Sequence, residues 1–380
     1  MGVQTILYRV LLYLKRRNVT YGIKNYVHKM ITLNAQVNEL NNKDGLNKWI
    51  KKWSVFGGKL NPEMYKFFHH YIGDNVNIVP GDISQNFIEP VLTPQEFQPF
   101  YNDKNSFGLF IPKEMMPTTY FRVINGLLYD GEYNAIDKSK FETLFEKAEK
   151  LIVKPSKDMG GHGISLFTRD NKSGWFQNSD GNKLTLEFLL SKYKRDFLVQ
   201  ECLKQSSFMA QFNPTSVNTL RLGVYRDIKT GELRLQGAVL RIGGKGSFVD
   251  NITSGGSSTP IDVENGKLGK YTCDISRVRH SVYNDIDFAD NEFIVPNWDK
   301  IKTFVFEVAR HMPHMCLFAN DVALDENGNP VLIEVNTTNF TYTIYQVNGK
   351  PFYGEYTDDV IEYCYSQQKN LKPHIILKME

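Results

Sequence analysis

The 380-residue chain has few cysteines, no low-complexity segment, no internal repeat and only a slight excess of positive charge. No Cys-x-x-Cys spacing occurs, which argues against a zinc site or a disulfide framework and is typical of a reducing cytoplasm. Charged residues make up 23% and aromatic residues 13%, so the chain is globular and long enough for two or three domains. The formal net charge of +3 is too small to indicate nucleic acid as a partner.

The first 30 residues are basic and contain no acidic residue, the first being Glu39. Their apolar stretch is interrupted by Arg9 and is too short to span a bilayer. The basic residues follow the apolar stretch, whereas in a signal peptide they precede it. Two interpretations remain open: a helix docked on its own domain, or a basic amphipathic helix on an anionic membrane surface. The apolar positions at helical spacing are Ile6, Leu7, Val10, Leu11 and Leu14.

Beyond a mostly helical first 95 residues, short β-rich runs mix with helical segments and show no regular βαβ repeat. This pattern predicts an α+β fold with mainly antiparallel sheets. Predicted strands are Thr119–Ile124, Leu151–Lys154, Phe197–Gln200, Thr219–Tyr225 and Leu233–Leu240. Predicted helices are Lys138–Lys150, Leu184–Lys194 and Trp298–Met312.

Two apolar runs flank Asn327-Gly328, a pair typical of the turn of a tight β-hairpin. If these two residues form the turn, Asp321 lies directly opposite Glu334. Asn336 then shares the face of Glu334, two residues along the strand. Pro330 leaves a longer loop and a shifted register open.

Like charges directly opposite each other destabilise a sheet, so the hairpin predicts a cation between its two acids. Carboxylate and amide oxygens suit Mg²⁺, which usually takes one or two carboxylates and leaves other positions to water and phosphate. A solvated hairpin face that carries two chance acids is the alternative.

A second candidate site follows the predicted strand that ends at Lys154. The chain there enters a loop that contains Gly160, Gly161 and Gly163. Glycines let backbone N–H groups close on an anion, and the lysine adds a positive charge. The Walker A pattern is absent, so this loop alone predicts either a phosphate cradle or a flexible hairpin.

Three features follow one another along the chain: the glycine loop, the segment Asn218-Thr-Leu-Arg221 and the acidic hairpin. With this order of features, the chain resembles ATP-grasp enzymes over about residues 100–345. The most specific feature is Asp321 followed thirteen residues later by Glu-x-Asn. Asn-Thr-Leu-Arg and Asp-Asn-x-x-x-Gly-Gly further resemble the subgroup associated with bacterial surface-sugar and polysaccharide gene clusters. The matching segments are Asp103-Lys104, Val153-Lys-Pro155, the glycine loop, Leu198-Val-Gln-Glu201, Asn251-x-x-x-Gly255-Gly256 and Asp321 with Glu334-x-Asn336.

The resemblance implies an ATP site. Lys104 and Lys154 would contact the α- and β-phosphates. The hinge around Gln200, Glu201 and Leu203 would present its backbone to the adenine edge, with Glu201 as the nearest side chain. The mobile loop that closes over the phosphates would contain Gly160, Gly161, His162 and Gly163.

The resemblance also implies the groups around the reacting phosphate. Asp321, Glu334 and Asn336 would hold one or two Mg²⁺ ions. Arg221 would steady the transferred phosphoryl group, and Asn251 would hold the acyl phosphate or the acceptor. Arg221, Asn251 and Lys154 are therefore the expected catalytic residues.

The expected fold is an ATP-grasp fold with a helical region over residues 1–95, a nucleotide-binding subdomain over 96–215 and a metal-binding subdomain over 216–380. The expected activity is an ATP-dependent carboxylate–amine ligase that forms an acyl phosphate on a sugar acid or amino acid in surface polysaccharide biosynthesis. A kinase that phosphorylates a sugar or other hydroxyl and a non-catalytic, nucleotide-dependent scaffold at a membrane surface remain open. The expected partners are small molecules, without nucleic acid, in the cytoplasm, with a peripheral membrane contact through residues 1–30 left open.

Overall fold

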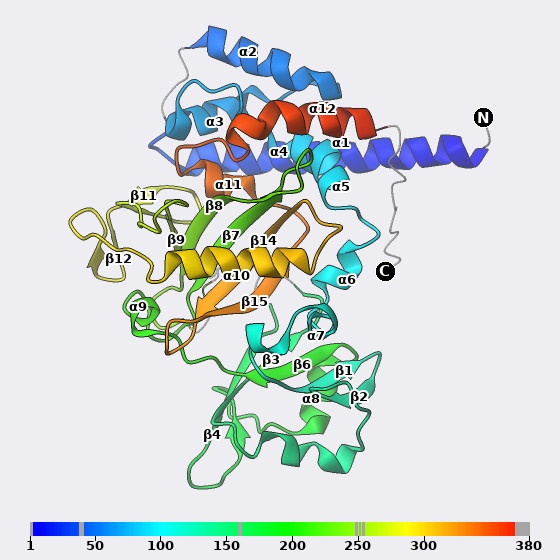
Figure 1. The fold of residues 1–380 in the computed structure, drawn as a ribbon, viewed down its shortest axis with the longest axis vertical. Helices are drawn as coiled ribbons and strands as arrows, with labels where there is room; N and C mark the ends of the chain where they lie inside the picture. The colour runs from blue at the N-terminus through cyan, green and yellow to red at the C-terminus, as the bar shows by residue number, and fades with distance from the viewer. Residues whose placement is uncertain are drawn as a thin grey trace.

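The computed structural model of the chain describes residues 3–37, 42–158, 162–247, 250, 252 and 255–368. The elements form three tiers: a helical layer built from both ends of the chain, a seven-stranded sheet and a six-stranded sheet (Figure 1). Strands pair antiparallel throughout the described residues, which confirms the predicted α+β class. The predicted boundaries at residues 95 and 215 stay a prediction.

The helical layer confirms the prediction for the first 95 residues in the part that is described. Local caps set its helices: the Asn61 side chain accepts a hydrogen bond from the Glu63 amide, Pro62 occupies the first turn, and Gly73 ends the helix with φ +80°. The layer consists of α1 (Val3–Leu33), α2 (Lys43–Trp53), α3 (Pro62–Ile72), α4 (Gly81–Ile83), α5 (Glu89–Leu92), α11 (Tyr342–Gln346) and α12 (Thr357–Gln367).

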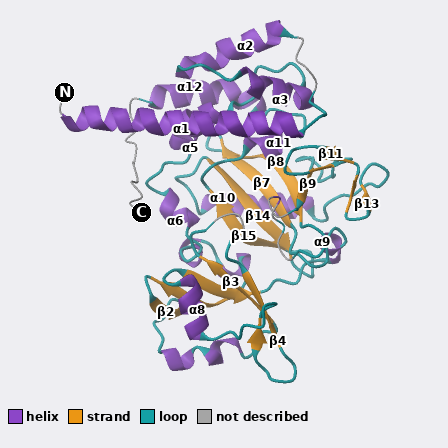
Figure 2. Ribbon diagram, turned by 180° about the vertical axis from the view of Figure 1, so that it is seen from behind, coloured by secondary structure: helices purple, strands orange, loops and turns teal. Residues whose placement is uncertain are grey.

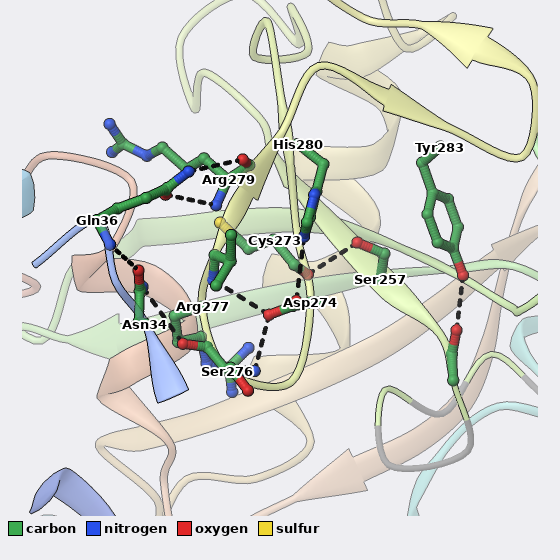
Figure 3. A network of polar contacts seen from close by, with 12 residues as sticks. Asn34, Gln36, Ser257, Cys273, Asp274, Ser276, Arg277, Arg279, His280 and Tyr283 are labelled. Carbon is green, nitrogen blue, oxygen red and sulfur yellow. Dashed lines mark hydrogen bonds and ion pairs between the residues drawn. The ribbon is translucent and has the colours of Figure 1, made fainter. Parts of the chain in front are cut away.

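The carboxyl end of α1 is tied to the edge of the seven-stranded sheet (Figure 3). The Asn34 Nδ2 atom donates to the Ser276 carbonyl at 3.4 Å. The Gln36 amide donates to the Arg279 carbonyl at 3.2 Å and accepts from the Arg279 N–H at 3.0 Å. These contacts join residues about 240 positions apart and fix the helical layer against the sheet.

The seven-stranded sheet has α10 (Trp298–Arg310) across one face, as Figures 1 and 2 show. Its strand order is β11-β10-β9-β8-β7-β14-β15. Alternate residues such as Leu220, Leu222 and Leu240 pack with α10 in one apolar core. The strands are β7 (Thr219–Arg226), β8 (Leu233–Ile242), β9 (Ser257–Pro260), β10 (Thr272–Cys273), β11 (Arg279–His280), β14 (Leu317–Leu324) and β15 (Pro330–Asn336), followed at the edge by the hairpin β12 (Val282–Tyr283) and β13 (Ile286–Asp287).

The opposite face of this sheet is apolar at one end and charged at the other. Tyr225, Val239 and Ala319 pack into the core of the helical layer. Gly237 allows this close approach, because a Cβ atom there would lie 2.4 Å from the Tyr345 ring. The remaining half of the face carries the polar residues of the candidate site.

The six-stranded sheet has the order β2-β1-β6-β3-β4-β5 and packs on α8 (Leu186–Tyr193). Its strands confirm the predicted ones within one or two residues. They are β1 (Thr119–Ile124), β2 (Leu127–Asp130), β3 (Lys150–Pro155), β4 (Ser165–Arg169), β5 (Phe176–Gln177) and β6 (Phe197–Glu201). Short helices α6 (Gln98–Asn102) and α7 (Phe107–Phe110) lead into this sheet, and α9 (Ser207–Ala210) leads out of it.

The helix predicted over Lys138–Lys150 is wrong. Two short 3₁₀ turns stand there, Lys138–Lys140 and Glu142–Phe145, and Lys150 already begins β3. The Arg169 guanidinium accounts for the difference, because it donates to the carbonyls of Phe145 at 2.6 Å and Ala148 at 2.9 Å. These carbonyls therefore find their partner in a distant side chain instead of in a helix.

The turn between β14 and β15 is longer than the predicted Asn327-Gly328 pair. A five-residue loop, 325–329, joins the strands, because Leu324 pairs with Pro330. The Asp325 carboxylate organises the loop by accepting hydrogen bonds from the amides of Asn327 at 3.0 Å and Asn329 at 2.7 Å.

The predicted pairing of Asp321 with Glu334 is nevertheless confirmed. The longer loop shifts the register by one residue, and a β-bulge between Asp321 and Val322 shifts it back. The simple hairpin prediction assumed too short a loop and missed the bulge. These two errors cancel at Asp321 and Glu334.

A buried carboxylate on α5 joins the helical layer to the loop that follows β15. Glu89 accepts a hydrogen bond from the Ser84 hydroxyl at 2.9 Å and another from the Phe340 amide at 3.2 Å. Burial raises the pKa of Glu89 to about 7 from an ordinary 4.5. The ionised form is therefore disfavoured in the folded protein.

We predict that Glu89→Gln removes a pH-dependent loss of stability. The unfolded chain ionises Glu89 near pH 4.5 and the folded chain only near pH 7, so ionisation destabilises the fold between these values and above. A shift of this size corresponds to about 3 kcal/mol. Chemical denaturation at pH 5, 6, 7 and 8 should show the free energy of unfolding of the variant rising relative to that of the wild type as pH rises. A difference that stays constant with pH would contradict the prediction.

Candidate functional site

A cavity of about 330 Å³ is lined by residues of both sheets. Its floor on the seven-stranded sheet comes from β7, β8, β14 and β15, and its other wall comes from β3, β6 and the segment after β6. Eight of the predicted site residues line it, namely Lys154, Gln200, Glu201, Leu203, Arg221, Asp321, Glu334 and Asn336. The fold therefore brings together residues that are up to 182 positions apart in the sequence.

Asp321 lies at the centre of a network of buried charges. Its two carboxylate oxygens accept from Nε and Nη2 of Arg221 at 2.7 and 2.6 Å, the two-pronged geometry of a strong ion pair. Arg241 Nη1 adds a third contact at 3.0 Å, and Arg241 Nη2 reaches Asp250 at 3.2 Å. The Thr219 hydroxyl also donates to Asp250.

Strand register explains why these side chains meet. Asp321 pairs with Arg221 on one side and with Glu334 on the other, and Thr219 pairs with Arg241. Paired residues point to the same face of a sheet, so these side chains gather on one surface.

The network shifts the pKa values of its members. Burial opposes the charge of Asp321, but the two guanidinium groups outweigh burial and hold its pKa below the ordinary value. Burial likewise opposes the charge of Arg221. The neighbouring Asp321 outweighs burial, so the pKa of Arg221 is raised. Burial raises the pKa of Asp250, with Arg241 only partly compensating. The cluster is thus stable only while its charges stay paired.

The cations beside the two hairpin acids are protein side chains in this structure. Arg221 and Arg241 accompany Asp321, and Lys104 Nζ lies 2.8 Å from Glu334 Oε1. Lys104 also donates to the Asp158 carbonyl at 2.8 Å, at the start of the glycine loop. The like charges predicted from the hairpin are therefore neutralised from neighbouring segments.

Lys154 is buried beside these groups and is only 8% exposed. Burial, and then the nearby charge of Lys104, lower its pKa to about 7, while Glu334 opposes the shift. An ammonium group that is this poorly solvated gains strongly from a bound anion.

The hinge segment leaves one backbone donor for a ligand. The amides of Glu201 and Cys202 donate to the carbonyls of Thr118 at 2.8 Å and Lys150 at 3.1 Å. The Leu203 amide has no hydrogen-bond acceptor among the described residues, and Leu203 lines the cavity. The Gln200 side chain donates from Nε2 to the Thr119 hydroxyl at 2.9 Å, so it is engaged within the six-stranded sheet.

The glycine loop is described only at its end. Gly160 and Gly161 lie outside the described residues, as does Asn251. His162 and Gly163 are exposed and do not line the cavity. Gly163 has φ +73°, and a Cβ there would lie 2.8 Å from Pro155 Cγ, so the chain turns back on β3 at a position that only glycine fits.

The oxygen donors of the hairpin fit Mg²⁺. Glu334 and Asn336 line the cavity, and Asp321 holds the Asn336 amide nitrogen at 3.4 Å, which orients the amide oxygen away from it. A carboxylate oxygen has two lone pairs, so Asp321 can keep its arginines and still contribute to a metal. Among the described residues, no group of three or more His, Cys, Asp or Glu side chains is placed to hold a metal ion. The hairpin set is instead the mixed carboxylate–amide type that Mg²⁺ accepts.

Sequence reasoning missed Arg241 and Asp250. The strand predicted over Leu233–Leu240 stops one residue before Arg241, and β8 in fact continues to Ile242. Only the observed register, which includes a β-bulge between Gly223 and Val224, places Arg241 beside Thr219 and so near Arg221. Asp250 precedes Asn251 in the segment that resembled the family, and only the fold shows its contact with Arg241.

Comparison with known protein families gives a match to the sugar-transfer associated ATP-grasp family over residues 83–357. The chain belongs to this family. The match covers most of the chain and begins inside the helical layer, earlier than the resemblance recognised from the motifs. No curated protein matches the chain.

The chain is also similar, at low sequence identity, to several solved structures. The biotin carboxylase domain of Hydrogenobacter thermophilus 2-oxoglutarate carboxylase, with MgADP and bicarbonate, is 12% identical over 67% of this chain and 46% of that one, with a TM-score of 0.37. N5-carboxyaminoimidazole ribonucleotide synthetase from Thermotoga maritima is 12% identical over 67% and 48%, with a TM-score of 0.35. D-cycloserine synthetase is 9% identical over 72% and 73%, with a TM-score of 0.39. This chain spans about half the length of the first two.

We predict that nucleotide binding takes up a proton at Lys154. The free side chain has a pKa of about 7, and a bound polyphosphate would raise it, so the complex keeps a proton that the free protein has lost above pH 7. Affinity for ATP should fall as pH rises from 7 to 9, by up to about tenfold per pH unit.

Calorimetry in two buffers of different ionisation enthalpy measures this uptake directly. We expect uptake of up to one proton at pH 8 and little at pH 6. Lys154→Met should abolish the uptake, whereas the exposed Lys150→Met on the same strand should keep it. Equal uptake in both variants would contradict the assignment.

Proposed function

We propose that the protein is an ATP-dependent carboxylate–amine ligase. The observation that carries the proposal is the arrangement of charges at one cavity, which is lined by Lys154, two arginines and the oxygen donors of the β14–β15 hairpin. Lys104 lies beside them, paired with Glu334. Phosphoryl transfer is catalysed almost entirely by positioning and by stabilising charge as it moves, and these groups supply both.

Each part of the cavity has a role in this proposal. The Leu203 amide receives the adenine edge, and Lys104 and Lys154 hold the phosphates. Glu334 and Asn336, with Asp321, would hold one or two Mg²⁺ ions, which supply positive charge to the β- and γ-phosphates.

Arg221 and Arg241 then hold the substrate carboxylate at the charged end of the cavity. A carboxylate oxygen attacks the γ-phosphorus, the bond to the bridging oxygen of ADP breaks, and ADP leaves. An amine attacks the carbonyl carbon of the acyl phosphate, phosphate leaves, and the amine loses its proton to solvent. The product is an amide. A sugar acid or amino acid of surface polysaccharide synthesis is the substrate class that the family name favours.

A kinase that phosphorylates a sugar hydroxyl is the second candidate. Asp250 favours it, because it lines the cavity and burial raises its pKa, as suits a group that takes a proton from a hydroxyl. Product analysis separates the two: a ligase releases phosphate only when acid and amine are both present. A nucleotide-dependent scaffold without catalysis releases none.

We predict that Glu334→Gln lowers phosphate release by about 100-fold or more, because it removes a charge that acts at the transferring phosphate. The matched control is Glu326→Gln in the loop of the same hairpin, where Glu326 pairs with exposed Lys204 at 2.7 Å. Release should be measured with Mg²⁺ and ATP across pooled amino acids, uronic acids and amines. Full activity in Glu334→Gln would exclude both enzyme proposals.

We also propose a peripheral contact between α1 and an anionic lipid surface. The first half of α1 extends past the other helices of the layer (Figures 1 and 2). Leu7, Val10, Leu14 and Tyr21 recur at spacings of three, four and seven and are 57%, 48%, 44% and 67% exposed. They form an apolar stripe on the side of the helix opposite Val27, which is buried.

Charge favours lipid over a second copy of the chain. Lys15 and Arg17 flank the stripe on its two sides, and no acidic residue occurs before Glu39. Two such helices placed side by side would bring like charges together, whereas anionic headgroups would neutralise them. No described helix is long and apolar enough to cross a membrane, so the contact would be with the surface.

We predict that the protein sediments with phosphatidylserine vesicles and much less with phosphatidylcholine vesicles. Leu7→Ser with Leu14→Ser should abolish sedimentation, and Lys15→Glu with Arg17→Glu should weaken it at least tenfold. Leu127→Ser, at a residue that is 61% exposed on the six-stranded sheet, is the control and should change nothing. A dimer in light scattering, lost in the Leu7 and Leu14 variant and without vesicle binding, would contradict the proposal.

A further inference from the structure

A second cavity, of about 200 Å³, lies within the helical layer. Its walls come from α1, α3, the start of α4 at Gly81, the loop between β15 and α11, and the start of α11. We call it the helix-layer pocket. It is lined by Ile23, Tyr26, Val27, Met64, Phe68, Val79, Gly81, Gln85, Asn339, Phe340, Thr341, Tyr342 and Thr343.

The helix-layer pocket and the charged cavity share a rim. Asn339 and Thr341 line both cavities and are exposed. The chain between them bends sharply, with Asn339 at φ +51°, in the left-handed region that asparagine tolerates better than most residues. A molecule at this rim can therefore reach into both cavities.

Residues of α5 and α6 fix the position of this rim. The Thr337 hydroxyl and amide donate to Asn102 Oδ1 at 2.8 and 3.2 Å, and the Phe340 amide donates to buried Glu89 at 3.2 Å. Both acceptors belong to the segment before the six-stranded sheet. The rim is thus held on either side of Asn339 by residues outside the two sheets.

The two cavities differ in chemistry. No charged side chain is among the residues that line the helix-layer pocket, whereas Arg221, Arg241 and Lys154 line the other cavity. A charge in the helix-layer pocket would lose its water without gaining a partner. An apolar group there would be covered by aromatic and aliphatic side chains, and its burial would be favourable.

We propose that the helix-layer pocket binds an aromatic or short aliphatic group of the substrate, while the carboxylate of that substrate lies against Arg221 and Arg241. The proposal rests on the proposed ligase function and narrows its substrate class. Cavities of about 150 Å³ lined by Leu, Ile and Phe hold benzene, so the pocket is large enough for a phenyl ring or a short alkyl chain. A free uronic acid has no such group and would leave the pocket unused.

Binding of small carboxylates in the presence of MgADP tests the proposal without requiring turnover. The probes are 3-phenylpropionate and octanoate, compared with acetate and glucuronate, by calorimetry. We expect both apolar acids to bind at least tenfold more tightly than acetate and glucuronate. Equal or weaker binding of the apolar acids would overturn the proposal.

A pair of leucine substitutions locates the binding. A Cβ at Gly81 would lie 3.4 Å from Ile23 Cγ2 and 3.6 Å from the Met64 methyl group, which are ordinary contacts, so a leucine there would extend into the pocket. Gly22 has nothing within 4 Å and is exposed on the same helix as Ile23. Gly81→Leu should weaken 3-phenylpropionate binding at least tenfold with the ADP affinity unchanged, and Gly22→Leu should change neither.

A third variant keeps the test decisive if Gly81→Leu does not fold. Ile23→Ala enlarges the pocket and should shift the preference from 3-phenylpropionate toward longer or bulkier acids, such as 4-phenylbutyrate, by at least threefold. An unchanged preference would count against the pocket.

Turnover is scored separately, with hydroxylamine as the amine, which converts an acyl phosphate to a hydroxamate and phosphate. Probe binding that depends on Gly81 without hydroxamate formation would uphold the pocket and count against the ligase. Hydroxamate formed only from polar acids, at the same rate in Gly81→Leu, would uphold the ligase and overturn the pocket.

Discussion

The ion pair between Asp321 and two arginines is the interaction on which the arrangement of the site depends. Asp321 is 3% exposed, and a carboxylate this deeply buried persists as an anion only with partners in good geometry. Arg221 comes from β7 and Arg241 from β8, so the pairing holds three strands in one register. That register also sets Glu334 opposite Asp321 and Asn336 two residues further along. The oxygen donors and the cations of the cavity therefore occupy fixed relative positions before any ligand arrives.

The same sheet face serves two purposes along its length. Its apolar half lies under the helical layer, where Tyr225 and Val239 pack with residues from both ends of the chain. Its charged half faces the six-stranded sheet across the cavity. The loop after β15 crosses the boundary between these halves, and Glu89 fixes it from the helical layer. The first 95 residues, whose role is obscure from their sequence, thus position one wall of the charged cavity and form most of the helix-layer pocket.

Particular elements show how far sequence reasoning reaches. Strands such as Thr119–Ile124 follow from local composition, because aromatic and β-branched residues favour strands. Lys138–Lys150 is not helical, because Arg169 from a distant strand takes the carbonyls that a helix would use. Asp321 and Glu334 face each other because a bulge offsets a longer loop, which residue spacing alone does not reveal. Arg241 was missed because strand ends are set by pairing with neighbours.

The sequence by itself determined the class of the protein: an antiparallel α+β fold, a helical first region and the ordered motifs of an ATP-grasp chain. The fold class depends on period and turn residues, which are local properties of the chain, and the motifs were identified by their resemblance to a known family. Only the tertiary structure decided that two arginines neutralise Asp321, that Lys104 reaches Glu334 and that an apolar pocket adjoins the charged cavity. Such contacts join residues 80 to 230 positions apart, and their geometry depends on how sheets and helices pack. No local pattern carries that information.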